Sequence, residues 1–144
     1  MARRSRGDAS GPAPVTLVDT SVWIDFFAGR EAAHVARLER LLAEDADVAI
    51  CGINLTEILQ GLRDEVSVQR VRRFLEPLIL LPMGESVFVA AATLYRELRA
   101  KGVTIRKTND CIIAATAMAH DCALLHNDRD FTSMARHVAL VVTD

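Results

Sequence analysis

Short apolar runs recur along this chain, and each except the last is followed by one or two segments with helical periodicity. The first run extends from Val15 to Val18, is rich in β-branched residues and ends at Asp19, as expected of a buried strand. Four further runs cover residues 48–51, 78–81, 123–126 and 138–142. Short strands that alternate with helices favour a parallel sheet covered on both faces. The chain is therefore predicted to be an α/β protein, a three-layer α/β/α sandwich with a five-stranded, mainly parallel sheet.

Apolar stripes at helical spacing predict the segments between these strands. The first helix runs from Val22 to near Gly29, and the others cover residues 31–45, 55–63, 65–76, 85–101, 110–121 and about 130–136. Polar residues suited to capping these helices stand at Thr20, Ser21, Asn54, Thr108 and Asn109. Residues 1–14 are rich in Arg, Gly and Pro, and we expect them to form a flexible tail ahead of a single domain over 15–144.

Size and charge limit what the chain can do. Its 144 residues are 51% hydrophobic and 25% charged, which allows a sizeable core and excludes a disordered chain. The net charge of −2 supplies no global basic field, so a nucleic-acid partner would need a local patch or metal ions. The apolar stretch from Val15 to Phe27 is interrupted by Asp19 and Asp25, and we expect no membrane association.

The cysteines indicate the compartment. There are three, Cys51, Cys111 and Cys122, with no CxxC motif. An odd number in this arrangement favours a reducing, cytoplasmic location over a disulfide framework. Cys122 and His126 are four residues apart, but two ligands without a second pair do not predict a zinc site.

Acidic residues stand where the predicted elements meet. Asp19 ends the first strand, Glu57 lies early in the helix after the second strand, and Asp128 directly follows the fourth. Open α/β sheets bind ligands at the carboxyl ends of their strands, so right-handed crossovers would bring these three acids to one edge. Asp110 lies in the first turn of the helix before the fourth strand. Asp130, two residues after Asp128, is an alternative fourth acid.

Each acid near a helix start also has a structural explanation, because carboxylates cap free N–H groups there. Their joint placement favours a binding site. Two carboxylates about 4 Å apart repel by about 4 kcal/mol at an effective dielectric constant of about 20, and a divalent cation removes that cost. Oxygen ligands alone select hard ions, so we expect Mg²⁺, with Mn²⁺ as a substitute, and metal-assisted hydrolysis of a phosphodiester.

A local excess of positive charge precedes Asp110. Five basic residues and one acid lie between Arg96 and Lys107. Cations suit the C-terminal end of a helix, which explains Arg96 and Arg99. Arg106 and Lys107 stand just before Asp110, and we expect them to contact substrate phosphates.

Four segments together resemble PIN-domain ribonucleases, and in particular VapC-type toxins of type II toxin–antitoxin pairs. They are LVDTSVWIDFF, INLTEILQGL, KTNDCIIAATA and LLHNDRDF. Each segment alone is a weak signal, but the combination in this order is specific, and the resemblance covers residues 15–144.

The resemblance implies a metal-dependent endoribonuclease that cuts RNA and thereby inhibits translation and growth. The family's catalytic and metal-binding acids correspond to Asp19, Glu57, Asp110 and Asp128. Asn127 stands where the family often has Ser or Thr, and a hydrogen bond to the site or substrate is expected from it. Family members are typically homodimers, and each is inhibited by a small antitoxin whose tail packs on apolar helices and reaches the acidic pocket.

Two surfaces are candidates for these partners. Trp23, Phe26 and Phe27 would suit the antitoxin groove, although a Trp/Phe stripe at helical spacing is more often plain core. Small side chains in Val87–Ala92 and Ile112–Ala119 would permit the close helix packing of a homodimer.

Other functions stay open on the sequence alone. A haloacid-dehalogenase-like phosphatase needs a second Asp two residues after its nucleophile, where this chain has Ser21. A phospho-acceptor receiver domain needs an Asp closing its third strand and a Lys closing its fifth, which the predicted strands do not offer. A PIN nuclease of RNA processing or DNA repair would fit the same motifs as a toxin, and a neighbouring antitoxin gene would distinguish the two. A non-catalytic α/β domain is a further alternative.

Overall fold

A single parallel sheet organises the chain. The computed structural model describes residues 14–143, so the prediction of a tail over 1–14 lies outside the described residues except at Pro14. The strands are β1 (Val15–Val18), β2 (Asp47–Ile50), β3 (Ile79–Leu80), β4 (Ala123–Leu125) and β5 (Val142–Thr143). They lie in the order β3-β2-β1-β4-β5, and every neighbouring pair is parallel. The predicted five-stranded sheet is confirmed.

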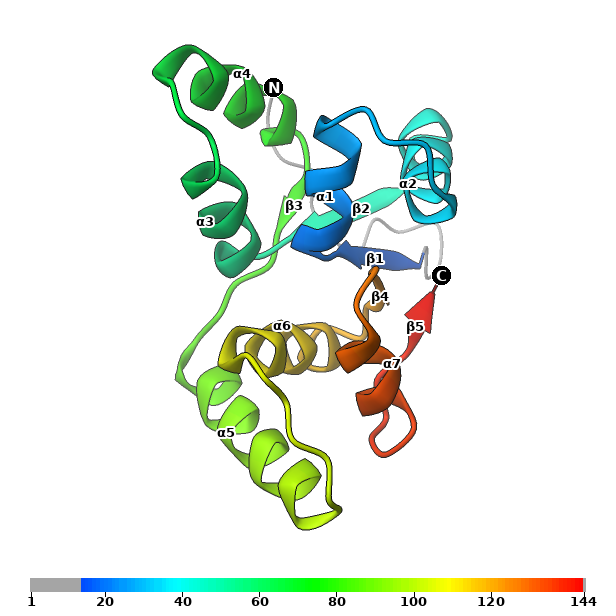
Figure 1. Ribbon diagram of the computed structural model, residues 1–144, viewed down its shortest axis with the longest axis vertical. Helices are drawn as coiled ribbons and strands as arrows, with labels where there is room; N and C mark the ends of the chain where they lie inside the picture. Colours follow the sequence, from blue (N-terminus) through cyan, green and yellow to red (C-terminus); the bar gives the residue numbers. More distant parts are fainter. Residues whose placement is uncertain (1–13, 144) are drawn as a thin grey trace, which may run out of the picture.

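Helices cover both faces of this sheet. They are α1 (Thr20–Phe27), α2 (Ala33–Ala43), α3 (Gly52–Gln60), α4 (Glu65–Leu75), α5 (Glu85–Ala100), α6 (Thr108–Ala119) and α7 (Arg129–Ala135). In Figure 1, α1 to α4 lie on one side of the strands and α5 to α7 on the other. Side chains alternate between two buried clusters, with Leu17 of β1 in the cluster of α5 and α6 and Val18 in the cluster of α1. The predicted three-layer sandwich is thereby confirmed.

The central position of β1 determines where the site forms. β2 and β4 pair with its two edges, and Leu17 lies opposite Ala49 on one side and Leu124 on the other. The N–H of Asp19 donates to the carbonyl of Leu125 at 2.9 Å, which ties the ends of β1 and β4 together. The carboxyl ends of these parallel strands therefore meet at one edge of the sheet.

The last strand differs from its prediction. The sequence predicts a strand over 138–142, but β5 contains only Val142 and Thr143, which pair with β4. The N–H of Val138 instead donates to the carbonyl of Met134 at 3.0 Å and closes α7. Leu140 is buried in the core of the α5 and α6 side. The apolar residues of this segment therefore serve packing before the strand begins.

The N-cap predictions for Thr20, Ser21, Thr108 and Asn109 are wrong. Asn54 is not the N-cap residue either, but it caps α3 from the third helical position, where its Oδ1 accepts from the N–H of Cys51 at 3.2 Å. The N-cap residues of α1, α3 and α6 are Asp19, Cys51 and Lys107. In α3, Gly52 is the first helical residue, and a glycine gives no helical signal in the sequence. The polar side chains thus lie inside the helices, and those of Thr20, Asn54 and Asn109 also contact residues of other elements.

Most of the expected dimer surface on 112–119 lies inside the chain. Ile113, Ala114 and Ala117 are fully buried within the chain, because α6 packs against α5 and β4. Its small side chains serve an intramolecular contact. On α5, Phe88 and Val89 are exposed instead. Among residues 14–143, no helix is long and apolar enough to cross a membrane.

Candidate metal centre

Asp19 is held in place by its own helix. It caps α1, and its Oδ2 accepts hydrogen bonds from the N–H of Ser21 at 3.0 Å and from the Ser21 hydroxyl. The side chain is almost fully buried. Burial raises the pKa of Asp19 above its ordinary value, the Ser21 hydrogen bonds oppose this, and the charge of Glu57 adds to the increase. Asp19 is therefore both a cap and a buried acid beside Glu57.

Glu57 of α3 is oriented by neutral donors. The Thr20 hydroxyl donates to Glu57 Oε1 at 2.8 Å, and Asn109 Nδ2 donates to Oε2 at 3.4 Å. Asn54 is fully buried, and its Nδ2 donates in turn to the Thr20 oxygen at 3.1 Å. We call Asp19 and Glu57 the hydrogen-bonded pair, because each accepts hydrogen bonds from neutral groups: Asp19 from the backbone and hydroxyl of Ser21, and Glu57 from Thr20 and Asn109.

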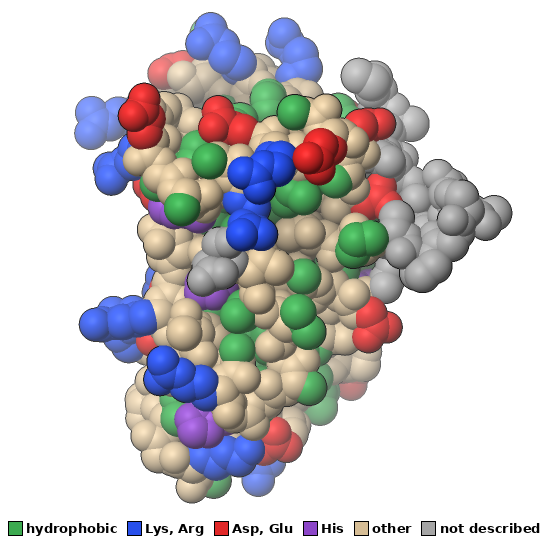
Figure 2. Space-filling model, turned by 90° about the vertical axis from the view of Figure 1, so that its right-hand side faces the viewer, with side chains coloured by type: hydrophobic (Ala, Val, Ile, Leu, Met, Phe, Trp, Pro, Cys, Tyr) green, Lys and Arg blue, Asp and Glu red, His purple; other side chains and the backbone are tan. Residues whose placement is uncertain are grey.

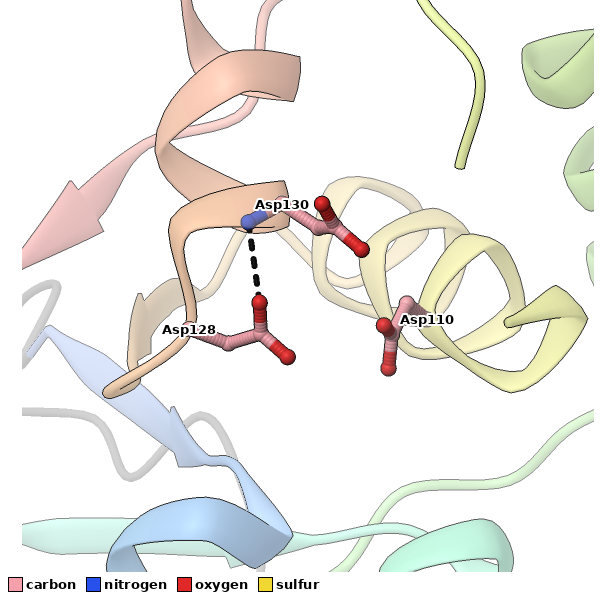
Figure 3. Close-up of side chains that lie close together, drawn as sticks. All are labelled: Asp110, Asp128 and Asp130. Atoms are coloured by element: carbon pink, nitrogen blue, oxygen red, sulfur yellow. Dashed lines mark hydrogen bonds between the residues drawn. The ribbon is translucent and has the colours of Figure 1, made fainter. Parts of the chain in front are cut away.

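A second group of acids comes from two other elements. One carboxylate oxygen each of Asp110, Asp128 and Asp130 lies within 4.8 Å of the other two. Asp110 projects from the start of α6 and the other two from the start of α7, and the carboxylates point toward a shared space (Figure 3). We call these three residues the acidic triad. The structure therefore brings Asp130 into the site beside Asp128, so neither stands there alone.

Within the triad, Asp110 differs from Asp128. Asp128 caps α7 and accepts from the N–H of Asp130 at 2.9 Å. Asp110 is the third residue of α6, and its Oδ2 is buried with no hydrogen-bond partner among the described residues. Burial is the largest cause that raises the pKa of Asp110 to about 7 from 3.8, with contributions from Asp128, Asp19 and Asp130 and opposition from Lys107. A buried carboxylate oxygen without a donor is costly unless a ligand satisfies it.

Cations face the triad from the loop before α6. Arg106 Nε lies 3.2 Å from Asp130 Oδ2, and its Nη2 lies 3.6 Å from Asp128 Oδ1. Lys107 Nζ lies 4.0 Å from Asp128 Oδ2. The sequence predicts phosphate contacts for both cations. In the structure both cations face the acids, and the phosphate contacts stay a prediction.

Two further contacts join the loops at this edge. The N–H of Asp128 donates to His126 Nδ1 at 3.1 Å, and the N–H of Asn127 donates to the Ser21 oxygen at 3.1 Å. Ser21 thus links the end of β4 to Asp19. The roles of Ser21, Thr20, Asn54 and Asn109 at the site were missed on the sequence. Their positions in the sequence could have indicated these roles, because each of the four residues lies within three residues of a candidate acid.

The donor set suits a hard divalent cation. The triad offers only oxygen ligands, one of them without a partner, and the charge of Asp19 acts on Asp110. Carboxylate oxygens in this arrangement match Mg²⁺ or Mn²⁺ better than zinc. All five candidate acids thus lie at the carboxyl edge of the sheet as two electrostatically linked groups.

Comparison with known proteins identifies the family. The profile of the PIN domain matches residues 16–137. Ribonuclease VapC11 of Mycobacterium tuberculosis is 37% identical over 122 residues, which are 83% of this chain and 91% of that protein. VapC ribonuclease Mb1587 of Mycobacterium bovis matches with the same identity and coverage.

Solved structures agree with the fold. A chain of VapBC2 from Rickettsia felis superposes with a TM-score of 0.72 at 22% identity, over 90% of this chain and 97% of that one. A chain of a toxin–antitoxin complex from Klebsiella pneumoniae gives a TM-score of 0.68 at 25% identity, over 90% of this chain and 96% of that one. The chain therefore belongs to the PIN-domain family, and its curated relatives are VapC ribonucleases.

Proposed function

We propose that this protein is a metal-dependent endoribonuclease that acts as the toxin of a toxin–antitoxin pair. Its relatives at 37% identity are named as VapC ribonucleases. The observation that carries the metal dependence is the buried Oδ2 of Asp110, which has no hydrogen-bond partner among the described residues and belongs to a carboxylate that lies close to those of Asp128 and Asp130. The phosphatase and receiver alternatives have no support from the family.

Asp110, Asp128 and Asp130 would hold the ion, with Asp19 and Glu57 beside them. A bound Mg²⁺ or Mn²⁺ would supply Lewis-acid polarisation of a phosphodiester and activation of water. Thr20 and Asn109 orient Glu57 by hydrogen bonds, and Ser21 orients Asp19. The site therefore presents fixed acids before substrate arrives, as catalysis by preorganised groups requires.

RNA is the proposed substrate, and the chain must bind it through local contacts. On the face shown in Figure 2, Lys and Arg side chains stand at several separate places among acidic and apolar ones. Arg106, Lys107 and Asn127 are the proposed contacts for RNA, and all three are exposed at the rim of the acids. At these positions the three side chains could contact the sugar–phosphate backbone of an RNA that lies across the acidic site.

A small antitoxin is the proposed regulator, and α1 and α4 offer an aromatic surface for it. Trp23 is fully buried and stacks on Phe27, so this residue is core. Phe74 of α4 lies 5.5 Å from both Phe26 and Phe27 between ring centroids and is 43% exposed. An apolar tail packed here would lie on α1, the helix that Asp19 caps.

A homodimer is proposed as well, because members of the family are typically homodimers and because Phe88 and Val89 of α5 are exposed.

The second candidate function is a PIN nuclease of RNA processing or DNA repair. A cytoplasmic location stays a prediction from the cysteine pattern.

Two measurements test the function. The purified chain should cleave a structured RNA in Mg²⁺ or Mn²⁺, and excess EDTA should stop the reaction. Undiminished cleavage in EDTA would rule out metal dependence.

Expression in a bacterial host should arrest growth, and co-expression of a small protein encoded beside this chain should restore it. Cleavage without growth arrest would favour the RNA-processing or repair alternative.

A further inference from the structure

The loop between α5 and α6 holds two cations at the acidic triad. After α5, Gly102 has a φ of +81° and the N–H of Val103 donates to the carbonyl of Leu98 at 2.8 Å, which turns the chain back. Ile105 then inserts into the core and is almost fully buried. This anchor fixes the backbone beside Arg106 and Lys107.

The side chains of these cations contact the groups proposed to hold the metal. Arg106 contacts Asp130 through Nε and Asp128 through Nη2, and Lys107 approaches Asp128 through Nζ. The positive charge of Lys107 also lowers the pKa of Asp110, against the raising effect of burial. Two positive charges therefore offset the three carboxylates of the triad.

We propose that Arg106 is an exchangeable counter-ion of the acidic triad. In the metal-free protein its guanidinium neutralises Asp128 and Asp130. A divalent cation displaces it, and the freed guanidinium then serves an RNA phosphate. The inference rests on the proposed function, because it assigns the metal to the triad.

Exchange is favoured by the position of Arg106. Its side chain is 58% exposed, so the guanidinium can leave the acids without unpacking the core. Exposed ion pairs contribute little, about 0–1 kcal/mol each, and a divalent ion bound by several carboxylates competes well against them. A guanidinium is also well shaped for a phosphate. Metal loading would therefore increase RNA affinity through Arg106, and RNA would increase metal affinity by the same factor.

The test compares Arg106→Gln with Arg136→Gln, a matched loss of one positive charge from an exposed Arg at the end of α7. Calorimetric titration with Mn²⁺ in the absence of RNA gives the metal affinity of each protein. Arg106→Gln should bind Mn²⁺ about 2- to 10-fold more tightly than the parent, which corresponds to about 0.4–1.4 kcal/mol, because the competing ion pairs are removed. Arg136→Gln should match the parent within about twofold, because Arg136 forms no ion pair with the triad among the described residues and screening weakens the effect of its charge.

A second readout is thermal melting. In chelator, Arg106→Gln should melt below the parent, because the carboxylates lose their counter-ion, and saturating Mn²⁺ should reduce this difference. Equal Mn²⁺ affinity in parent and Arg106→Gln, or an equal gain in Arg136→Gln, would overturn the exchange and leave the nuclease function intact. A parent that binds no Mn²⁺ and cleaves RNA in EDTA would overturn both.

Discussion

The two halves of the acidic site are stabilised in opposite ways. Asp19 and Glu57, the hydrogen-bonded pair, receive hydroxyl, amide and backbone donors from within the fold. The acidic triad relies on a cap contact within α7 and on exposed cations, and one oxygen of Asp110 has no partner among the described residues. Donors built into helices stay in place when a metal ion arrives, whereas exposed cations are displaced.

This difference assigns separate tasks to the two halves. The fold determines the geometry of the hydrogen-bonded pair in advance. Asn54 and Thr20 are buried, Asn54 donates a hydrogen bond to Thr20, and Thr20 donates one to Glu57. The acidic triad carries negative charge that nearby donors and cations neutralise only in part. We therefore expect changes in the pair to act on activity through geometry, and changes in the triad to act on stability through charge.

Within the hydrogen-bonded pair, the largest expected effect is that of Asp19→Asn. Asn retains an oxygen that can cap α1, but it removes a charge beside Asp110 and Glu57. We expect RNA cleavage to fall by more than about 100-fold, because loss of a group that only orients a ligand already costs about 10- to 100-fold. Single-turnover cleavage in Mg²⁺ measures it.

Asp64→Asn is the matched control, because Asp64 caps α4 in the same way through the N–H of Ser67 and is fully exposed. This variant should cleave at the parental rate. Equal cleavage rates for the parent and Asp19→Asn would show that Asp19 acts only as a helix cap.

Thr20→Val should have the next largest effect. Val preserves the β-branched shape but removes the donor to Glu57 Oε1 and the acceptor for Asn54 Nδ2. We expect cleavage to fall by about 10- to 100-fold, with the fold retained. Thr93→Val, which removes an exposed hydroxyl from α5, serves as control in the same assay. Parental activity of Thr20→Val would show that Glu57 needs no orientation.

A smaller effect is expected from pH. The pKa of Asp110 is raised from 3.8 to about 7, so the folded metal-free protein keeps a proton that the unfolded chain loses. Its free energy of unfolding should therefore fall as pH rises from about 4 to about 7 and level off above, by a few kcal/mol at most at about 1.4 kcal/mol per pKa unit. Urea unfolding of the parent and Asp110→Asn in EDTA at several pH values measures this. The same slope in both proteins would exclude Asp110 as its source.

The sequence predicted those parts of the site that follow from strand ends. Asp19 and Asp128 come directly after β1 and β4, and parallel strands bring such positions together. It could not choose between Asp128 and Asp130, because both lie at the start of α7 and only the turn of the backbone directs both carboxylates to Asp110.

Contacts between distant residues were beyond the sequence. Arg106 and Asp130 are 24 residues apart, and their ion pair depends on how Ile105 anchors the loop. The sequence predicts Asn54 as the N-cap because Gly52 conceals the true start of α3, whereas Asn54 caps from the third helical position and its contact with Thr20 spans 34 residues. Local patterns thus identify the acids, while packing determines what holds them.

The central claim is that Asp110 belongs to a metal-binding group of acids, and melting of Asp110→Asn with and without metal tests it most directly. Asn nearly preserves the shape and, at a pH above the Asp110 pKa of about 7, removes one of the repelling charges. We predict that the variant melts above the parent in EDTA, gains less than the parent from Mg²⁺, and loses RNA cleavage. A variant that melts below the parent in EDTA, gains as much from Mg²⁺ and cleaves RNA at a near-parental rate would contradict the account.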